Sequence, residues 1–368
     1  MLIKIINCHP SEYEENERKQ LALSNLLVSY GTKRNILIAE NGVFDDIVSS
    51  NLYGSIHKIY AHEANSNRRE YGNLKNELAV YVNVDFTNNI SKCEYINKIY
   101  VITLDYTIFS NPENTNGTSL LTENSLDYKV YNIIAEYYSK ILSKRGLNIF
   151  FKEHLGAGSH SKSEFDRLSQ EKKILLCLID NDKPHPNKGE GSTSVKFTQF
   201  DKSYNINSLA TVLSAREIEN IIPTKTLEST VLTFSKDCIE KIDQITKFNK
   251  KNNQFRRFFD HKNGLTLKEA ITLDNTYGRF WLDILSIDKR FSKKECFQSR
   301  QCTECDSCPK IDGLGDNILK NLVNKSQNES IRDFIPSIDD FLLDDWNQLG
   351  HLLVSWGCCA SGKVSRAS

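Results

Sequence analysis

ILLCLIDND, at residues 174–182, is the segment of the chain that says most about its fold. Six consecutive apolar residues precede two aspartates. A short run that is apolar on both faces is typical of a strand buried inside a parallel sheet. Open α/β sheets carry their sites in the loops at the carboxyl ends of such strands. We therefore expect a functional loop directly after this strand, in KPHPNKGEGSTS at 183–194.

The residues before this strand alternate between strand-like and helix-like patterns. Short apolar runs predict strands at 2–7, 34–40, 98–106 and 147–155. Apolar residues at helical spacing predict helices at 14–31, 129–146 and 161–173, the last with Ser161 as its N-cap. NPENTNGTS, at 111–119, is expected to be a loop. The alternation predicts an α/β fold with a doubly wound, mostly parallel sheet.

The pattern changes near residue 214, where helical segments take over. We expect helices at 214–222, 226–249, 316–325 and 337–356. The resulting prediction is an α/β domain at 1–225, a helical domain at 226–360 and a flexible tail at 361–368.

Composition narrows the class of protein. The chain has 368 residues, and its 47 Lys and Arg balance its 47 Asp and Glu, so a uniformly basic surface that coats nucleic acid is excluded. A local basic groove is still compatible with this balance. No apolar run reaches the roughly 18 residues of a membrane span, and the first residues turn acidic at once. We expect a cytoplasmic protein that does not span a membrane.

The two aspartates that end the buried strand are the first candidate site. Asp180 and Asp182 flank Asn181, and their side chains share one side if the backbone stays extended. Carboxylate oxygens, with water and phosphate oxygens, are the ligands that Mg²⁺ prefers. Asp and Asn are also ordinary turn residues, so a strand-end turn without metal remains the alternative.

Three neighbouring segments strengthen the metal hypothesis. The apolar run RNILIAE ends in Glu40, with Gly42 and Asp45 following, and the glycine loop LGAGSHSK lies at 155–162. SAREIENIIP contributes Glu217 and Glu219. Because these two are two residues apart, a helix would point them to different faces, and only one could then bind the ion directly.

In this combination the region 34–225 resembles a TOPRIM domain, the Mg-dependent fold of topoisomerases, primases and overcoming-lysogenisation-defect nucleases. REIENIIP resembles the nuclease branch, including the stand-alone TOPRIM nucleases of anti-phage defence. The family's E-G-x-x-D becomes Glu40-Asn41-Gly42-Val43-Phe44-Asp45 here, with one extra residue, and the distance to Asp180 implies an insertion near 50–130. Glu153 is a rival for the strand-end glutamate.

The resemblance implies a metal-dependent nuclease for DNA or RNA, acting in anti-phage defence. Its catalytic residues would be Glu40, Asp180, Asp182, Glu217 and Glu219, and Glu40, Asp180 and Asp182 would hold Mg²⁺ or Mn²⁺. No G-x-x-x-x-G-K-[ST] loop occurs, so any ATPase would be a separate subunit. His160 and His185 could transfer protons near such a site. The alternative is a non-catalytic subunit that binds nucleic acid or protein; the enzyme hypothesis requires Glu40 within ~6 Å of the two aspartates.

Four cysteines form the second candidate site. Cys296, Cys302, Cys305 and Cys308 lie within thirteen residues and are followed by Pro309. Four thiolates can complete a tetrahedral structural Zn²⁺ site. An iron–sulfur cluster and free thiols are the alternatives.

Basic and aromatic residues alternate at 248–270. Arg256, Arg257 and Lys262 stand among phenylalanines at 255, 258 and 259. Basic side chains neutralise phosphates and aromatic rings stack on unpaired bases, so this segment is a candidate nucleic-acid contact. Its alternative is a solvated helix face with the phenylalanines in the core.

Overall fold

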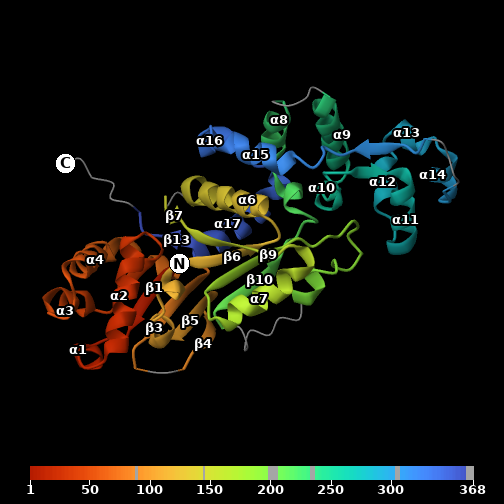
Figure 1. Cartoon of the computed structure of the whole chain (residues 1–368). Coiled ribbons are helices and arrows are strands. Elements are labelled where there is room, and N and C mark those ends of the chain that lie inside the picture. The colour runs from red at the N-terminus through yellow and green to blue at the C-terminus, as the bar shows by residue number, and fades with distance from the viewer. Residues whose placement is uncertain (88–89, 144–145, 198–205, 233–236, 303–306, 362–368) are drawn as a thin grey trace. The chain divides into compact units, whose positions relative to one another are not determined.

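The computed structural model describes residues 1–87, 90–143, 146–197, 206–232, 237–302 and 307–361 (Figure 1). The chain divides into two compact units. The first contains 1–178, 200–211 and 347–368, and the second contains 179–199 and 212–346. The division falls directly after Leu178, whereas the sequence analysis placed it near 225. Asp180 and Asp182 therefore belong with the helical residues.

The first unit begins with a five-stranded sheet in the order β2-β1-β3-β5-β4. Its strands are β1 (Leu2–Ile6), β2 (Ile36–Ala39), β3 (Val80–Asp85), β4 (Lys92–Ile96) and β5 (Ile99–Asp105). All neighbours run parallel except β4, which pairs antiparallel with β5 at the edge. The patterns at 2–7, 34–40 and 98–106 predicted β1, β2 and β5, and no pattern had indicated β3.

Helices accompany this sheet (Figure 1). They are α1 (Pro10–Tyr13), α2 (Glu17–Gly31), α3 (Val43–Ser49), α4 (Ser55–Ser66) and α5 (Arg68–Tyr71). The side chain of Asn16 accepts the backbone N–H of Lys19 and caps α2, and one face of this helix buries Leu23, Leu26 and Leu27. The predicted helix at 14–31 is confirmed.

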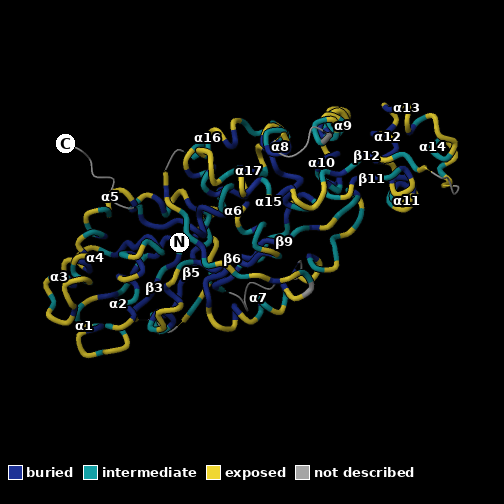
Figure 2. Tube along the Cα trace, turned by 45° about the horizontal axis from the view of Figure 1, so that its top comes forward, coloured by how far each residue is buried: buried dark blue, intermediate teal, exposed yellow. Residues whose placement is uncertain are grey.

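A second, four-stranded sheet has the order β10-β9-β6-β8. Its strands are β6 (Thr118–Thr122), β8 (Phe151–Leu155), β9 (Leu175–Ile179) and β10 (Ser208–Val212). β6 runs parallel to both β8 and β9. Every residue of β6 and β9 is buried (Figure 2). The predicted loop at 111–119 is wrong at its end, because β6 begins at Thr118.

Two helices connect these strands. They are α6 (Ser125–Tyr137), which continues as a π-helical turn at Tyr138–Leu142, and α7 (Ser161–Gln170). Ser161 is the first residue of α7 rather than its cap, since His160 holds the cap position without a side-chain bond. The short strands β7 (Asn148–Ile149) and β13 (Cys358–Cys359) pair antiparallel.

The second unit is mostly helical. Its helices are α8 (Thr224–Val231), α9 (Asp237–Lys251), α10 (Phe255–Phe258), α11 (Leu267–Tyr277), α12 (Trp281–Leu285), α13 (Lys289–Ser292), α14 (Glu295–Ser299), α15 (Ile318–Ser326) and α16 (Ile331–Phe334). β11 (Gly264–Thr266) and β12 (Lys310–Asp312) form an antiparallel pair. The chain then returns to the first unit along α17 (Leu343–Gly357).

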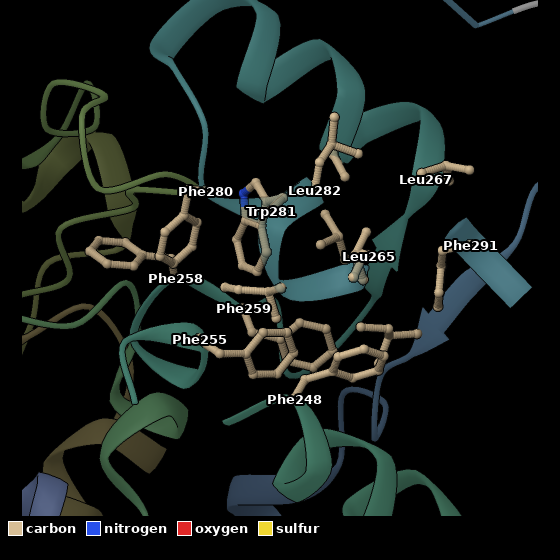
Figure 3. Close-up of a cluster of buried hydrophobic side chains, with 14 of the residues drawn as sticks. Phe248, Phe255, Phe258, Phe259, Leu265, Leu267, Phe280, Trp281, Leu282 and Phe291 are labelled. Carbon is tan, nitrogen blue, oxygen red and sulfur yellow. The ribbon is translucent and has the colours of Figure 1, made fainter. Parts of the chain in front are cut away.

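The core of the second unit is built around aromatic side chains (Figure 3). Trp281 is 1% exposed, and its ring meets those of Phe255 and Phe280 edge to face. The predicted α/β fold with mostly parallel pairing and a helical C-terminal region is confirmed, with two larger sheets instead of one. Among the described residues, no helix combines the length and apolar character needed to cross a membrane.

Candidate functional site

Asp180 and Asp182 follow the strand β9 as predicted, but the backbone does not stay extended through Asp182. Asp180 follows Ile179 directly and is half-buried. Asn181 is buried, and its side chain donates to Leu213 O (3.0 Å) and accepts Lys183 N (2.8 Å). Asp182 has φ of 55°, in the left-handed region. The extended D-x-D that would point both aspartates to one side is therefore absent.

Asp182 joins the loop after β9 to the segment at 216. Its N–H donates to Arg216 O (3.0 Å). Gly191 packs against it so closely that a Cβ at 191 would lie 2.5 Å from the Cβ of Asp182. Loss of solvation raises the pKa of Asp182, although the residue as a whole is exposed, while Arg216, Lys262 and Lys188 lower it. The charge environment of this carboxylate is cationic.

Glu217 and Glu219 converge on one cation. The Nζ of Lys262 lies 3.3 Å from Glu217 Oε2 and 3.1 Å from Glu219 Oε1. The prediction that these glutamates face different ways is wrong, because Glu217 is extended (φ −143°) and precedes the 3-10 turn Ile218–Ile221 that holds Glu219. Both carboxylates therefore reach the same point.

Buried hydrogen bonds hold this segment against the one that carries Lys262. Asn220 accepts the N–H of Glu217 on its side-chain oxygen (3.0 Å) and donates to Phe259 O (2.8 Å). The N–H of Arg216 donates to Arg257 O (2.8 Å). The two glutamates and the lysine are thus positioned by a rigid backbone frame.

The carboxylates of Glu217 and Glu219 keep Lys262 charged. Burial raises the pKa of Glu217, against the pull of Lys262. Burial also lowers the pKa of Lys262, but Glu219 and Glu217 outweigh it and the pKa rises above its usual value. A second cation, Arg216, pairs with Asp260 (2.9 Å) and lies 3.7 Å from Glu217 Oε1. The cluster Asp182, Glu217, Glu219, Asp260, Arg216 and Lys262 is called the acid–lysine cluster below.

The structure does not place Glu40 in the sheet that contains β9. Glu40 follows β2, in the five-stranded sheet, and its Oε2 accepts the N–H of Asn7 (3.0 Å). Asn7 has φ of 53° and donates through its side chain to Asp85 (3.1 Å). Glu40 thus stabilises the turn after β1, and its assignment as the strand-end glutamate beside Asp180 is wrong. The interval 50–130 is not an insertion, because it holds strands of both sheets.

A different glutamate, Glu123, stands at the end of a strand in the sheet that contains β9. It follows β6, the parallel neighbour of β9. Leu121 is paired with Cys177, and this register carries Glu123 to the level of the residue before Asp180. The signal was present in the sequence as Glu123-Asn124-Ser125-Leu126-Asp127, which has the spacing of E-G-x-x-D without an extra residue. The rival Glu153 is exposed within the edge strand β8 and does not end it.

The glycine loop packs on the end of β6. Gly156 N–H donates to Thr122 O (2.8 Å), and Ala157 N–H donates to Glu123 O (3.2 Å). A Cβ at Gly156 would lie 2.4 Å from Ser161 Oγ, so only glycine fits this turn. Asp127 completes a capping box with Asn124 at the start of α6. Strand end, glycine turn and helix start are thus fixed together around Glu123.

The two candidate histidines differ. His160 is exposed. His185 is fully buried, with Nε2 3.1 Å from Gly278 O and 3.6 Å from Asp274 Oδ1. Asp274 in turn accepts the N–H groups at the start of α12. His185 therefore anchors the loop after β9 to α11 and is a structural residue.

The basic segment does not present its arginines to solvent. Arg256 is 2% exposed and donates to Ile222 O (2.6 Å) and Thr224 Oγ1 (3.0 Å). Burial lowers its pKa to about 10. Arg257 is paired with Asp345 (2.5 Å). The prediction of phosphate contacts by these two arginines is wrong, since both are bound to protein groups.

The phenylalanines of this segment are core residues. Phe255 and Phe259 are 0% exposed and Phe258 is 8% exposed (Figure 3). They are not available to stack on bases, and the alternative of a solvated helix with a phenylalanine core is correct for them. Lys262 belongs to the acid–lysine cluster, where its Nζ contacts Glu217 and Glu219.

The cysteine segment is described only in part. Cys305 lies outside the described residues. Cys296 and Cys308 are half-buried and Cys302 is exposed. Within the described ranges, no three His, Cys, Asp or Glu side chains are grouped so as to hold a metal ion. The zinc prediction stays a prediction.

The first unit thus has two mostly parallel α/β sheets, and the second unit carries the acid–lysine cluster. This cluster can bind cations and, through Lys262 and Arg216, phosphate oxygens. Comparison of the chain with family models, with curated proteins and with solved structures found no match.

Proposed function

We propose that the chain is a metal-dependent phosphodiesterase of nucleic acid, a TOPRIM-like nuclease. The observation that carries the proposal is the convergence of Glu217 and Glu219 on a single cationic atom, beside the loop that begins with Asp180 and Asp182. Both carboxylates approach the same cationic atom, at 3.1 and 3.3 Å.

The residues fit a hard divalent ion. Asp180, Asp182, Glu217 and Glu219 offer only oxygen donors, which suit Mg²⁺ and Mn²⁺. Since the described residues contain no preformed group of three such side chains, a bound ion would complete its shell with water and substrate oxygens. Such an ion lowers the pKa of bound water and neutralises charge on the phosphate.

The chain's own groups have distinct tasks in this proposal. Glu123 takes the role first given to Glu40, because it follows the strand next to β9. Lys262 and Arg216 hold phosphate oxygens and offset the negative charge that accumulates in the transition state. His185 takes no part, because it is fully buried against α11. The resemblance of REIENIIP to defence nucleases supports anti-phage defence as the setting, with a separate ATPase as a possible partner.

A non-catalytic binding subunit is the second candidate. The ion pairs of the acid–lysine cluster favour it. Lys262 neutralises charge on Glu217 and Glu219, and Arg216 neutralises Asp260. In this alternative the cluster only stabilises the fold. A nuclease assay with Mg²⁺ or Mn²⁺ against single-stranded and duplex DNA and RNA, with and without the ATPase of a neighbouring gene, separates the two.

Glu123→Gln and Glu40→Gln form a matched pair that tests the reassignment. We expect Glu123→Gln to reduce metal-dependent cleavage by about 10–100-fold, as changes next to a metal usually do. Glu40→Gln should retain cleavage, since Glu40 only accepts the N–H of Asn7. Initial rates at saturating metal measure both. The opposite ranking of the two variants would restore Glu40 as the strand-end glutamate.

The cysteines supply a separate prediction. Purified protein should contain about one zinc per chain, because four thiolates complete one tetrahedral site. Cys305→Ser should lose this zinc and lower the melting temperature, since structural metal binding contributes folding free energy. Cys238→Ser, outside the segment, is the control. Elemental analysis without zinc, with iron absent and the thiols freely titrating, would disprove the site.

A further inference from the structure

A polar hollow lies in the first unit, and none of its lining residues belongs to the acid–lysine cluster. It has a volume of about 760 Å³ and is formed where α4 ends and α5 and the 3-10 turn Leu74–Asn76 follow. Three cationic side chains and three amides supply most of its lining: Arg68, Arg69, Lys75, Asn65, Asn73 and Asn76. A serine and a glycine complete it. Of the eight lining residues, none has a carboxylate and none an apolar side chain.

The three cations of this hollow form no ion pair with a carboxylate in the part of the chain that the structure describes, although Glu70 stands next to Arg69 in the sequence. Within the described ranges, Arg69 and Lys75 form no ion pair, and Arg68 donates to the neutral side-chain oxygen of Asn41. The one carboxylate contact at the margin is made by Asn65, which donates to Asp45 Oδ1 (2.8 Å). A concave surface with three cations and no carboxylate of its own attracts anions.

The backbone that carries these side chains is anchored in the core. Tyr71 is 1% exposed and Leu74 is 5% exposed, and they lie between the cationic residues in the sequence. Asn67 donates to Tyr30 OH (2.8 Å). A Cβ at Gly72 would lie 2.8 Å from Arg68 O, so the turn is tight. The cations therefore project from a fixed scaffold, and binding an anion costs little ordering of the backbone.

We propose that this hollow, lined by Arg68, Arg69 and Lys75, binds the phosphodiester backbone of a nucleic acid without reading its sequence. Arginine, lysine, asparagine and serine are the residues that contact phosphate and sugar in protein–nucleic acid complexes. A pocket for a free nucleotide would offer an apolar or aromatic surface for the base, and this lining has none. The inference is independent of the proposed metal site, because phosphate contacts require no cleavage.

The test is a salt titration of binding in EDTA, where no cleavage occurs. Labelled single-stranded and duplex oligonucleotides of mixed sequence are followed by fluorescence anisotropy. Arg68→Ala/Arg69→Ala removes two contacts and should flatten the slope of log affinity against log salt by about 1.4–1.8, at about 0.7–0.9 per contact. Lys75→Ala should flatten it by about half as much. Arg18→Ala/Lys129→Ala, which removes two exposed cations from the same unit, should leave the slope unchanged.

Two further arms identify the anion. Inorganic phosphate and a mononucleotide should compete only at concentrations far above that of the oligonucleotide, and vesicles containing phosphatidylserine should not be retained. Three results would each overturn the proposal. They are equal competition by a mononucleotide, binding to the vesicles that depends on Arg68 and Arg69, and an unchanged salt slope in folded Arg68→Ala/Arg69→Ala. Circular dichroism confirms folding of each variant. Loss of cleavage in metal-site variants with normal binding in EDTA leaves this inference intact.

Discussion

Asp180→Ala is expected to lower metal-dependent cleavage by more than about 100-fold while the protein remains folded. Changes to residues that only support a metal ligand already cost about 10–100-fold, so loss of a direct ligand should cost more. Asp180 follows the buried strand β9 directly, at the level where the parallel neighbour β6 ends in Glu123. Removing a half-buried carboxylate from a strand end leaves the ladder hydrogen bonds of β9 in place.

The measurement is the initial cleavage rate at saturating Mg²⁺ or Mn²⁺, with a thermal melt of each variant. Asp182→Ala should behave in the same way. Asp283→Ala is the control, because Asp283 is an exposed aspartate of α12 in the same unit. Full activity of both strand-end variants would end the nuclease proposal and favour the binding-subunit alternative.

Arg256→Ala is expected to destabilise the protein by about 3–5 kcal/mol. The guanidinium of Arg256 is buried and donates to Ile222 O and Thr224 Oγ1. Truncation would leave these acceptors without a donor and open a cavity the size of a large side chain. Arg257→Ala is the matched neighbour, and it should cost less, because the side chain of Arg257 is 16% exposed whereas Arg256 is 2% exposed.

Urea unfolding followed by fluorescence measures both changes, since three tryptophans report on the fold. Nucleic-acid affinity provides the second readout. If Arg256→Ala keeps wild-type stability and instead flattens the salt dependence of binding by about 0.7–0.9, the residue contacts phosphate after all.

The buried strand β9 and the helices were predictable because each has an uninterrupted local pattern. ILLCLI has no polar residue to disturb it, and the helix at 17–31 shows apolar spacing throughout. β6 was missed for the opposite reason. TSLLT is only five residues long and follows a run of Asn, Pro and Gly, so the sequence indicates a loop. Its strand character depends on pairing with β8 on one side and β9 on the other.

The error at Glu40 followed from the same omission. Without a strand pattern for β6, the sequence gives Glu123 no strand to end, and it favours the longer apolar run before Glu40. The acid–lysine cluster was hidden for a different reason. Glu217 and Lys262 are far apart in the sequence, and their contact depends on the hydrogen bonds that the Asn220 side chain makes to the backbone, which no local pattern encodes.

The return of the chain to the first unit along α17 has a consequence for synthesis on the ribosome. Met1 N donates to Cys358 O, Ala79 N to Ser355 Oγ (2.8 Å) and Thr118 Oγ1 to Trp356 O (2.6 Å). Each of these hydrogen bonds joins residues that are at least 238 positions apart in the chain. At about 5–20 residues translated per second, roughly 10–35 s pass between the synthesis of β9 and the synthesis of residues 355–358.

During that interval the first unit of the nascent chain is not yet closed by α17. We therefore expect nascent chains stalled before residue 347 to be cut readily by protease within 1–178, and chains extended past residue 360 to resist. Equal resistance at both lengths would show that the unit closes without α17. If the proposed cleavage activity depends on this unit, it would be absent until α17 has been translated.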